Sequence, residues 1–145
     1  MYEYRCKIKK VVDGDTVDVD IDLGFDVILS DQRIRLYGID TPESRTRDKT
    51  EKQFGLAAKE FLKIMLGKVG TLKTHKDAKG KFGRILGEFV VYDPETDRQC
   101  SVNQLMIDKH LAVEYYGQSK DDIEGQHLKN RELLETKYYE HITVK

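Results

Sequence analysis

The sequence predicts a small mixed α+β domain, a closed or partly open β-barrel with helices packed against it. Three observations lead to this class. The first part of the chain alternates apolar and polar residues, a segment of helical spacing follows the third alternating stretch, and a second helical segment follows the fifth. The length of 145 residues is enough for one domain with its own core, and we expect a single domain over 1–145.

Three strands are expected before the first helix. Residues Tyr4–Val12 form the first, and the strict alternation of Thr16–Leu23 places its valines and isoleucine on one face and its aspartates on the other. Asp13–Asp15 between them has the composition of a tight hairpin turn. After a short apolar run at Phe25–Leu29, Arg33–Tyr37 alternates again and predicts a third strand with both arginines facing away from the core.

Helices and strands alternate in the rest of the chain. The segment Glu51–Leu66 has apolar residues at helical spacing, and Gly67 is a typical helix stop. The further expected elements are two strands (Val69–His75, Ile85–Tyr92), a short helix (Ser101–Lys109, capped by Ser101), an extended segment (Ala112–Tyr116) and a last helix (Gln126–Tyr139, with Leu128, Leu133 and Leu134 as apolar contacts). An OB-type barrel of five strands is the natural candidate for this order.

The overall charge excludes a protein that coats nucleic acid through a global excess of cations. The chain has 25 Lys and Arg against 26 Asp and Glu, a net charge of −1, so any phosphate-binding surface must be local. No stretch approaches the roughly 18 apolar residues of a membrane span, and the first seven residues lack the apolar core of a signal peptide. We therefore expect an intracellular protein without a membrane partner. Cys6 and Cys100 lack the spacing of a zinc site and are expected to be buried.

The most informative segment is Arg35–Glu43, in which a cation leaves a strand and two carboxylates follow in the loop. Pro42 disfavours the helical region at Thr41, so the backbone there should be extended and should present the Asp40 side chain and the Thr41 carbonyl in fixed directions. Oxygen donors without histidine or cysteine suit Ca²⁺ or Mg²⁺ better than zinc. A third donor could come from Asp15 in the first hairpin.

Each of these features also has a purely structural interpretation. The aspartates beside Gly14 are common turn residues, and Thr41 with Pro42 can begin a helix. Arg35 and Arg84 can be solvated surface cations. A functional site is favoured because one chain combines all of them.

The motifs resemble those of the thermonuclease family, typified by staphylococcal nuclease. Five segments occur in the family's order, from about residue 4 to residue 142. They are Val11–Val17, Arg35–Glu43, Glu51–Gly55 at the start of a helix, Lys81–Arg84 before a strand, and Gln126–Leu128 in the last helix. Each motif alone is modest evidence, whereas five in register are specific.

The resemblance implies a five-stranded OB-type barrel with three helices and a Ca²⁺-dependent phosphodiesterase site. Such a site would hydrolyse DNA and RNA and leave 3′-phosphate ends. By this resemblance, the Asp15 and Asp40 carboxylates and the Thr41 backbone carbonyl match the family's metal ligands. Asp13 matches a supporting acid nearby.

The remaining catalytic roles also follow from the resemblance. Glu43 matches the carboxylate that contacts the attacking water, and Arg35 and Arg84 match the guanidinium groups that hold the scissile phosphate. The chemistry of the residues agrees, because a hard dication and two arginines can neutralise the charge that accumulates on the phosphoryl oxygens.

The implied substrate-binding residues are Lys81 and the pair Tyr115 and Tyr116, whose register is ambiguous by one residue. Aromatic faces suit sequence-tolerant stacking on single strands. Packing at the barrel edge is an equally good interpretation of the tyrosines. The segment Leu23–Gln32 is longer than in the prototype and is expected to extend its hairpin near the site.

Two classes of function compete. The first is a metal-dependent endonuclease or combined endo/exonuclease that acts as a monomer on DNA or RNA. The second is a non-catalytic OB-type module that binds nucleic acid or a peptide. Such modules usually lose catalytic acids, and Asp15, Asp40 and Glu43 are all present here, so the nuclease is favoured.

Overall fold

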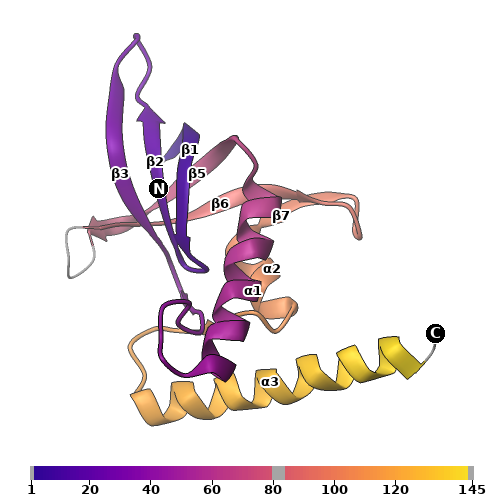
Figure 1. The fold of residues 1–145 in the computed structure, drawn as a ribbon. Coiled ribbons are helices and arrows are strands. Elements are labelled where there is room, and N and C mark those ends of the chain that lie inside the picture. The colour runs from indigo at the N-terminus through magenta and orange to yellow at the C-terminus, as the bar shows by residue number, and fades with distance from the viewer. Residues whose placement is uncertain (1, 80–83, 144–145) are drawn as a thin grey trace.

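The protein is a closed five-stranded barrel with helices on its outside (Figure 1). The structure, a computed structural model, describes residues 2–79 and 84–143. The barrel strands are β1 (Glu3–Asp13), β2 (Thr16–Asp22), β3 (Ile28–Leu36), β5 (Val69–Lys79) and β6 (Ile85–Asp93). Their order is β3-β2-β1-β5-β6, and a parallel pairing of β3 with β6 closes the ring. The structure thus confirms the expected OB-type architecture.

Two short pairings lie outside the barrel. Strand β7 (Arg98–Ser101), which the sequence analysis missed, continues the sheet beyond β6. Strand β4 (Ile39–Asp40) pairs with β8 (Val113–Glu114), the segment expected to be extended. This small ladder fixes the backbone of Asp40, one of the expected metal ligands.

The interior of the barrel follows the alternation in the sequence. Val17, Val19 and Ile21 of β2 and Ile34 and Leu36 of β3 are at most 2% exposed, while the residues between them face outward. Burying side chains of this size is the main driving force for the fold, roughly 1.5–3 kcal/mol each. The predicted inward and outward faces of both strands are therefore confirmed.

Helix α1 (Lys49–Leu66) covers one side of the barrel through a stripe that includes Ala58 and Leu62, both fully buried. It begins at Asp48, whose carboxylate accepts hydrogen bonds from two backbone N–H groups of the first turn. The alternative in which Thr41 and Pro42 begin a helix is therefore wrong, because the seven residues 42–48 separate Thr41 from the first residue of the helix.

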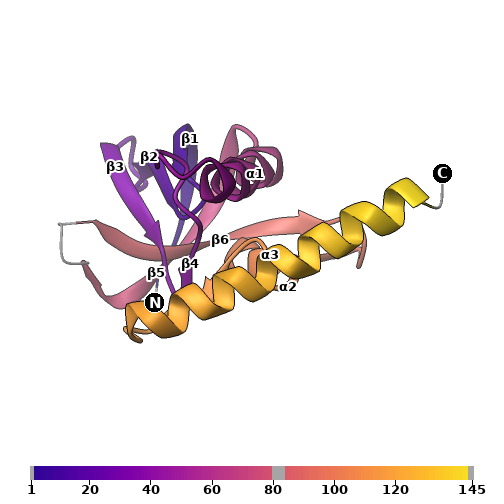
Figure 2. The same ribbon diagram turned by 60° about the horizontal axis from the view of Figure 1, so that its bottom comes forward.

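The other helices differ from expectation in detail. Helix α2 (Val102–Asp108) has Ser101 at its N-cap, but the serine side chain makes no capping hydrogen bond. Helix α3 (Lys120–Thr143) begins six residues earlier than expected and runs along the bottom of the molecule (Figures 1 and 2). Leu128 and Leu133 of α3 are 49% and 40% exposed, so they are not the buried apolar contacts of this helix that the sequence predicts. Leu134 is half-buried.

The β2–β3 hairpin does not extend towards the site, contrary to expectation. Thr16 pairs with Arg35 at one end of the two strands and Asp22 pairs with Ile28 at the other, next to the hairpin tip. The six steps between consecutive residues from Thr16 to Asp22 span roughly 20 Å. The tip carries the fully exposed Phe25 and points away from α3 (Figure 1).

The cysteines are isolated from each other. Cys6 is 1% exposed inside the barrel, and burial raises the pKa of its thiol to about 11. Cys100 is only half-buried, which corrects the expectation that both are buried. Neither forms a disulfide.

Among the helices of residues 2–79 and 84–143, none is both long enough and apolar enough to cross a membrane.

Candidate active site

The predicted site residues converge where the β1–β2 turn, the end of β3 and the β4 loop meet. The backbone N–H of Leu36 donates to the Asp15 carbonyl at 2.8 Å, which ties the end of β3 to the hairpin turn. The Thr41 N–H donates to Asp15 Oδ2 at 3.2 Å, which ties the loop after β4 to the same turn. Residues 26 positions apart are thereby held side by side.

Arg35 links the two predicted carboxylate ligands. Its Nη2 lies 3.5 Å from Asp15 Oδ2 and 3.6 Å from Asp40 Oδ1. Its Nη1 donates to the Leu36 carbonyl at 2.9 Å, which fixes the plane of the guanidinium. The Arg35 side chain is 13% exposed, so this charge cluster is partly shielded from water and is stronger than a surface ion pair.

Asp13 holds the loop that carries Glu43. Its carboxylate accepts a hydrogen bond from the hydroxyl of the buried Ser44, and it pairs with Arg45 at 3.3 Å. The Asp13 carboxylate therefore fixes the residue next to Glu43, and the supporting role implied for Asp13 stays a prediction.

Two glycines let α1 approach this loop closely. A Cβ on Gly55 would lie 2.4 Å from the Glu43 carbonyl oxygen, and a Cβ on Gly14 would lie 2.8 Å from the Cβ of Ala58. Both distances are too short for a carbon atom. The glycines therefore allow α1 to press the hairpin turn and the Glu43 loop together.

Substitution of Gly55 tests this packing. We expect Gly55→Ala to destabilise the protein by about 1–3 kcal/mol, because the added methyl group meets backbone atoms that cannot move aside cheaply. The measurement is chemical denaturation followed by circular dichroism. The control is Gly125→Ala in α3, where the new Cβ meets no atom within 4 Å. An alanine there should be neutral or stabilising. Equal stability of the Gly55 variant and the wild type would contradict the close approach.

Glu43 lies in an environment of negative charge. Partial burial raises the pKa of its carboxyl above the ordinary value of 4.5, and Asp15, Asp13, Asp40 and Glu51 raise this pKa further. The effect of the neighbouring acids means that the site has an excess of negative charge, which a cation would offset.

This raised pKa gives a stability prediction. Folded Glu43 holds its proton more tightly than the unfolded residue does, so stability should fall as the pH rises from about 4.5 through the raised pKa. In EDTA near pH 7, Glu43→Gln should raise Tm by on the order of 2 °C. The increase is small because solvent screens the charge of this partly exposed group. Thermal unfolding between pH 4 and pH 8 measures this, and the difference should vanish at the acid end. A lower Tm of the variant at pH 7 would contradict the cause given for the shift.

A pocket of about 680 Å³ contains the predicted catalytic residues. The charged residues of its lining include Asp15, Arg35, Asp40, Glu43 and Arg84, the last of which is half-buried directly before β6. The structure thus brings the predicted acids and both arginines to one cavity. Lys81 lies outside the residues that the structure describes.

The same pocket has an aromatic part. It is lined by Tyr115 and Tyr116, as expected, and also by Tyr37, which the sequence analysis did not select. The Tyr37 ring stacks on His75 with centroids 4.0 Å apart and meets the edge of Tyr116 at 6.0 Å. The expected strand Arg33–Tyr37 could have revealed Tyr37, because alternation along it places Tyr37 on the same face as Arg35.

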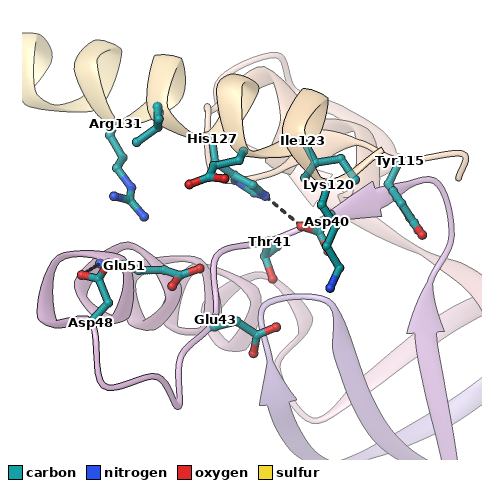
Figure 3. Close-up of a pocket in the computed structure, with 12 residues that line it drawn as sticks. Asp40, Thr41, Glu43, Asp48, Glu51, Tyr115, Lys120, Ile123, His127 and Arg131 are labelled. Carbon is teal, nitrogen blue, oxygen red and sulfur yellow. Dashed lines mark hydrogen bonds and ion pairs between the residues drawn. The ribbon is translucent and has the colours of Figure 1, made fainter. Parts of the chain in front are cut away.

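His127 is a second residue that was missed as a contributor to the site. Its Nε2 lies 2.8 Å from Asp40 Oδ2, and the ring comes from α3 (Figure 3). The pair borders a neighbouring pocket of about 420 Å³ between α3 and the start of α1, which Tyr115 and Glu43 also line. The sequence placed His127 in a family-like motif but gave no partner for it.

The donor chemistry fits a hard divalent cation. In the described part of the chain no group of three or more His, Cys, Asp or Glu side chains is gathered closely enough to form a complete site. However, Asp15 and Asp40 both face the guanidinium of Arg35. The backbone N–H of Thr41 donates a hydrogen bond to the Asp15 carboxylate. Two carboxylates with a backbone carbonyl are an oxygen set typical of Ca²⁺ or Mg²⁺, which complete their coordination with water.

The fold and this pocket define an OB-type barrel that carries carboxylates and arginines at one end. The family model of staphylococcal nuclease homologues matches residues 33–137, and the chain belongs to this family.

Three curated relatives are similar to the chain. Endonuclease YhcR of Bacillus subtilis (strain 168) is 29% identical over 79% of this chain and 9% of its own length. Thermonuclease of Staphylococcus intermedius is 36% identical over 54% of this chain and 44% of its own length. Micrococcal nuclease of Shigella flexneri is 29% identical over 82% of this chain and 64% of its own length. The chain thus spans less than two thirds of each of these relatives.

Proposed function

We propose that this chain is a Ca²⁺-dependent nuclease that hydrolyses phosphodiester bonds in DNA and RNA and leaves 3′-phosphate ends. The observation that carries the proposal is the position of Arg35, whose guanidinium faces Asp15 and Asp40 in the pocket that Glu43 and Arg84 also line. The nuclease names of the three relatives support the same class of reaction.

The residues that would hold the cation are Asp15, Asp40 and, through its carbonyl, Thr41. When bound, a divalent cation supplies positive charge that polarises the phosphoryl group and offsets the charge of the transition state. The protein keeps these oxygen ligands in place in two ways. The Thr41 N–H donates a hydrogen bond to the Asp15 carboxylate, and the β4–β8 ladder holds the backbone of Asp40. Preorganised donors of this kind need no rearrangement at the moment of reaction.

The two arginines would bind the scissile phosphate. Arg35 uses some of its donors on Leu36 and the carboxylates, and a guanidinium has five N–H groups, so donors remain for a phosphate oxygen. Arg84 lines the same pocket from the β6 side. Each guanidinium can donate two parallel hydrogen bonds to a phosphate, which orients the phosphate as well as attracting its charge.

Glu43 would act on the attacking water. An ionised carboxylate accepts the hydrogen bond of a water molecule and can orient it for in-line attack on phosphorus. Glu43 lines the same pocket as Asp15, Asp40 and the two arginines. Orientation together with partial general-base character therefore suits its surroundings.

The aromatic part of the pocket would take the bases that flank the scissile phosphate. Stacking on Tyr115, Tyr116 or Tyr37 does not depend on base identity and needs unpaired bases. This supports a sequence-tolerant enzyme that acts on single-stranded DNA and RNA.

Cleavage assays with and without cation test the proposal. Purified chain is incubated with 5′-labelled single-stranded DNA and RNA of one sequence in Ca²⁺, in Mg²⁺ and in EDTA. We expect cleavage in Ca²⁺, complete loss in EDTA, and products whose gel mobility changes when a phosphatase removes a 3′-phosphate. Cleavage that chelation leaves unchanged would contradict the metal dependence. Binding of both oligonucleotides without cleavage in either cation would instead support a non-catalytic module.

A further inference from the structure

We infer that His127 is a positioning residue that orients Asp40 for cation binding, an inference that rests on the proposed function. The imidazole Nε2 lies 2.8 Å from Asp40 Oδ2, and the His127 side chain is only 12% exposed. The contact joins α3 to the β4 loop across 87 residues of sequence (Figure 3).

The chemistry of the two groups fixes the direction of this hydrogen bond. An ionised carboxylate can only accept, so the imidazole Nε2 donates to Asp40 Oδ2. The second oxygen, Oδ1, faces Arg35 at 3.6 Å. The two oxygens of Asp40 therefore have separate roles, because Oδ2 is engaged by His127 while Oδ1 points into the site.

Without His127, only the longer contact with Arg35 at 3.6 Å would restrain rotation of the Asp40 carboxylate about its terminal bond. That torsion has broad energy wells, so no intrinsic preference directs one oxygen to the cation. The hydrogen bond from His127 to Asp40 Oδ2 removes this freedom. Outer partners of ligating carboxylates commonly act in this way, and their loss typically costs 10–100-fold in metal affinity.

The rest of α3 holds the imidazole in place. Asn130, one turn further along the helix, donates to the Ala112 carbonyl at 3.2 Å. The Arg131 guanidinium lies 5.6 Å from the centre of the Phe54 ring of α1. Ala112, which accepts the hydrogen bond from Asn130, precedes Val113, and Val113 pairs with Asp40 in the β4–β8 ladder. Helix α3 therefore supports both the backbone and the side chain of Asp40.

The experiment measures cation affinity in the absence of substrate. Isothermal titration calorimetry with CaCl₂ is performed on the wild type and on the variants His127→Ala, His127→Gln and Asn130→Ala. The glutamine amide can still donate to Asp40. Asn130→Ala weakens the anchoring of the same helix without touching Asp40. Circular dichroism and thermal unfolding verify that each variant is folded.

We expect His127→Ala to bind Ca²⁺ about 10–100-fold more weakly, His127→Gln to recover part of this loss, and Asn130→Ala to lose less than about 10-fold, because His127 can still donate to Asp40 in that variant. Wild-type affinity in His127→Ala would overturn the inference while leaving the proposed function intact. An equal loss in Asn130→Ala would also overturn it, because helix docking in general would then be responsible. Absence of Ca²⁺ uptake by the wild type would overturn both.

Discussion

An Arg35→Ala variant is expected to cleave single-stranded DNA with a kcat at least ~10²-fold below that of the wild type. A loss of this size is typical when one preorganised charge contact to the transition state is removed. Arg35 occupies the centre of the candidate site, where its Nη2 faces both Asp15 and Asp40. Ca²⁺ uptake should remain, because the oxygen donors are untouched. The measurement is single-turnover cleavage together with calorimetry of Ca²⁺ binding.

The matched control for this prediction is Arg33→Ala. Arg33 is on the same outward face of β3, but it pairs with Asp18 at 2.8 Å and its side chain is 51% exposed. Its replacement should leave kcat within about 2-fold of the wild type, since surface pairs contribute little. Wild-type turnover of Arg35→Ala, or an equal loss in both variants, would remove Arg35 from the catalytic set.

Glu43→Gln is expected to lower kcat by at least ~10²-fold, the lower end of the range for a group that accepts a proton in the transition state. The amide keeps the size of the side chain but loses the charge and basicity. The same variant is expected to be more stable without cation, so activity and stability should change in opposite directions. Cleavage rates and Tm measured on one preparation test both effects together.

Glu51→Gln provides the comparison for Glu43→Gln. Glu51 lies in the first turn of α1 and contributes to the raised Glu43 pKa. Its charge belongs to the same acidic neighbourhood, but Glu51 does not line the pocket of the two arginines. Turnover should therefore stay near that of the wild type. An equal loss of turnover in both variants would show that total charge, rather than the position of Glu43, controls the rate.

The barrel could be predicted because its strands alternate strongly. From Val17 to Asp22 of β2 every second residue is buried, and a slip of one residue would expose the valines, so the pattern fixes both the face and the register. The start of β3 was placed too late. Ile28 and Leu29 do pair with β2, but they are exposed on a hairpin tip, so they contribute no inward periodicity.

Helix α3 was predicted poorly because polar residues anchor it. Its half-buried stripe includes His127, Asn130, Arg131 and Leu134, which recur at helical spacing but of which only one is apolar. Leu128 and Leu133 lie off this stripe and are exposed. A pattern based on hydrophobic residues therefore selected the wrong face.

The site could be predicted in its residues but not in its contacts. The carboxylates and arginines were found because five short motifs were in register, and the structure places Asp15, Asp40, Glu43, Arg35 and Arg84 in one pocket. The contact of His127 with Asp40 depends on how α3 docks, which local sequence does not determine. The close approach of Gly55 to the Glu43 backbone likewise exists only in the folded chain.

The central claim is that Asp15, Asp40 and the Thr41 carbonyl share one divalent cation in the pocket of the two arginines. A crystal structure of the chain with Ca²⁺ and a nucleotide bisphosphate tests it most directly. We predict a single ion in contact with all three oxygen donors and a phosphate within hydrogen-bond distance of Arg35 and Arg84. An ion bound elsewhere, or a phosphate outside this pocket, would contradict the proposed mechanism.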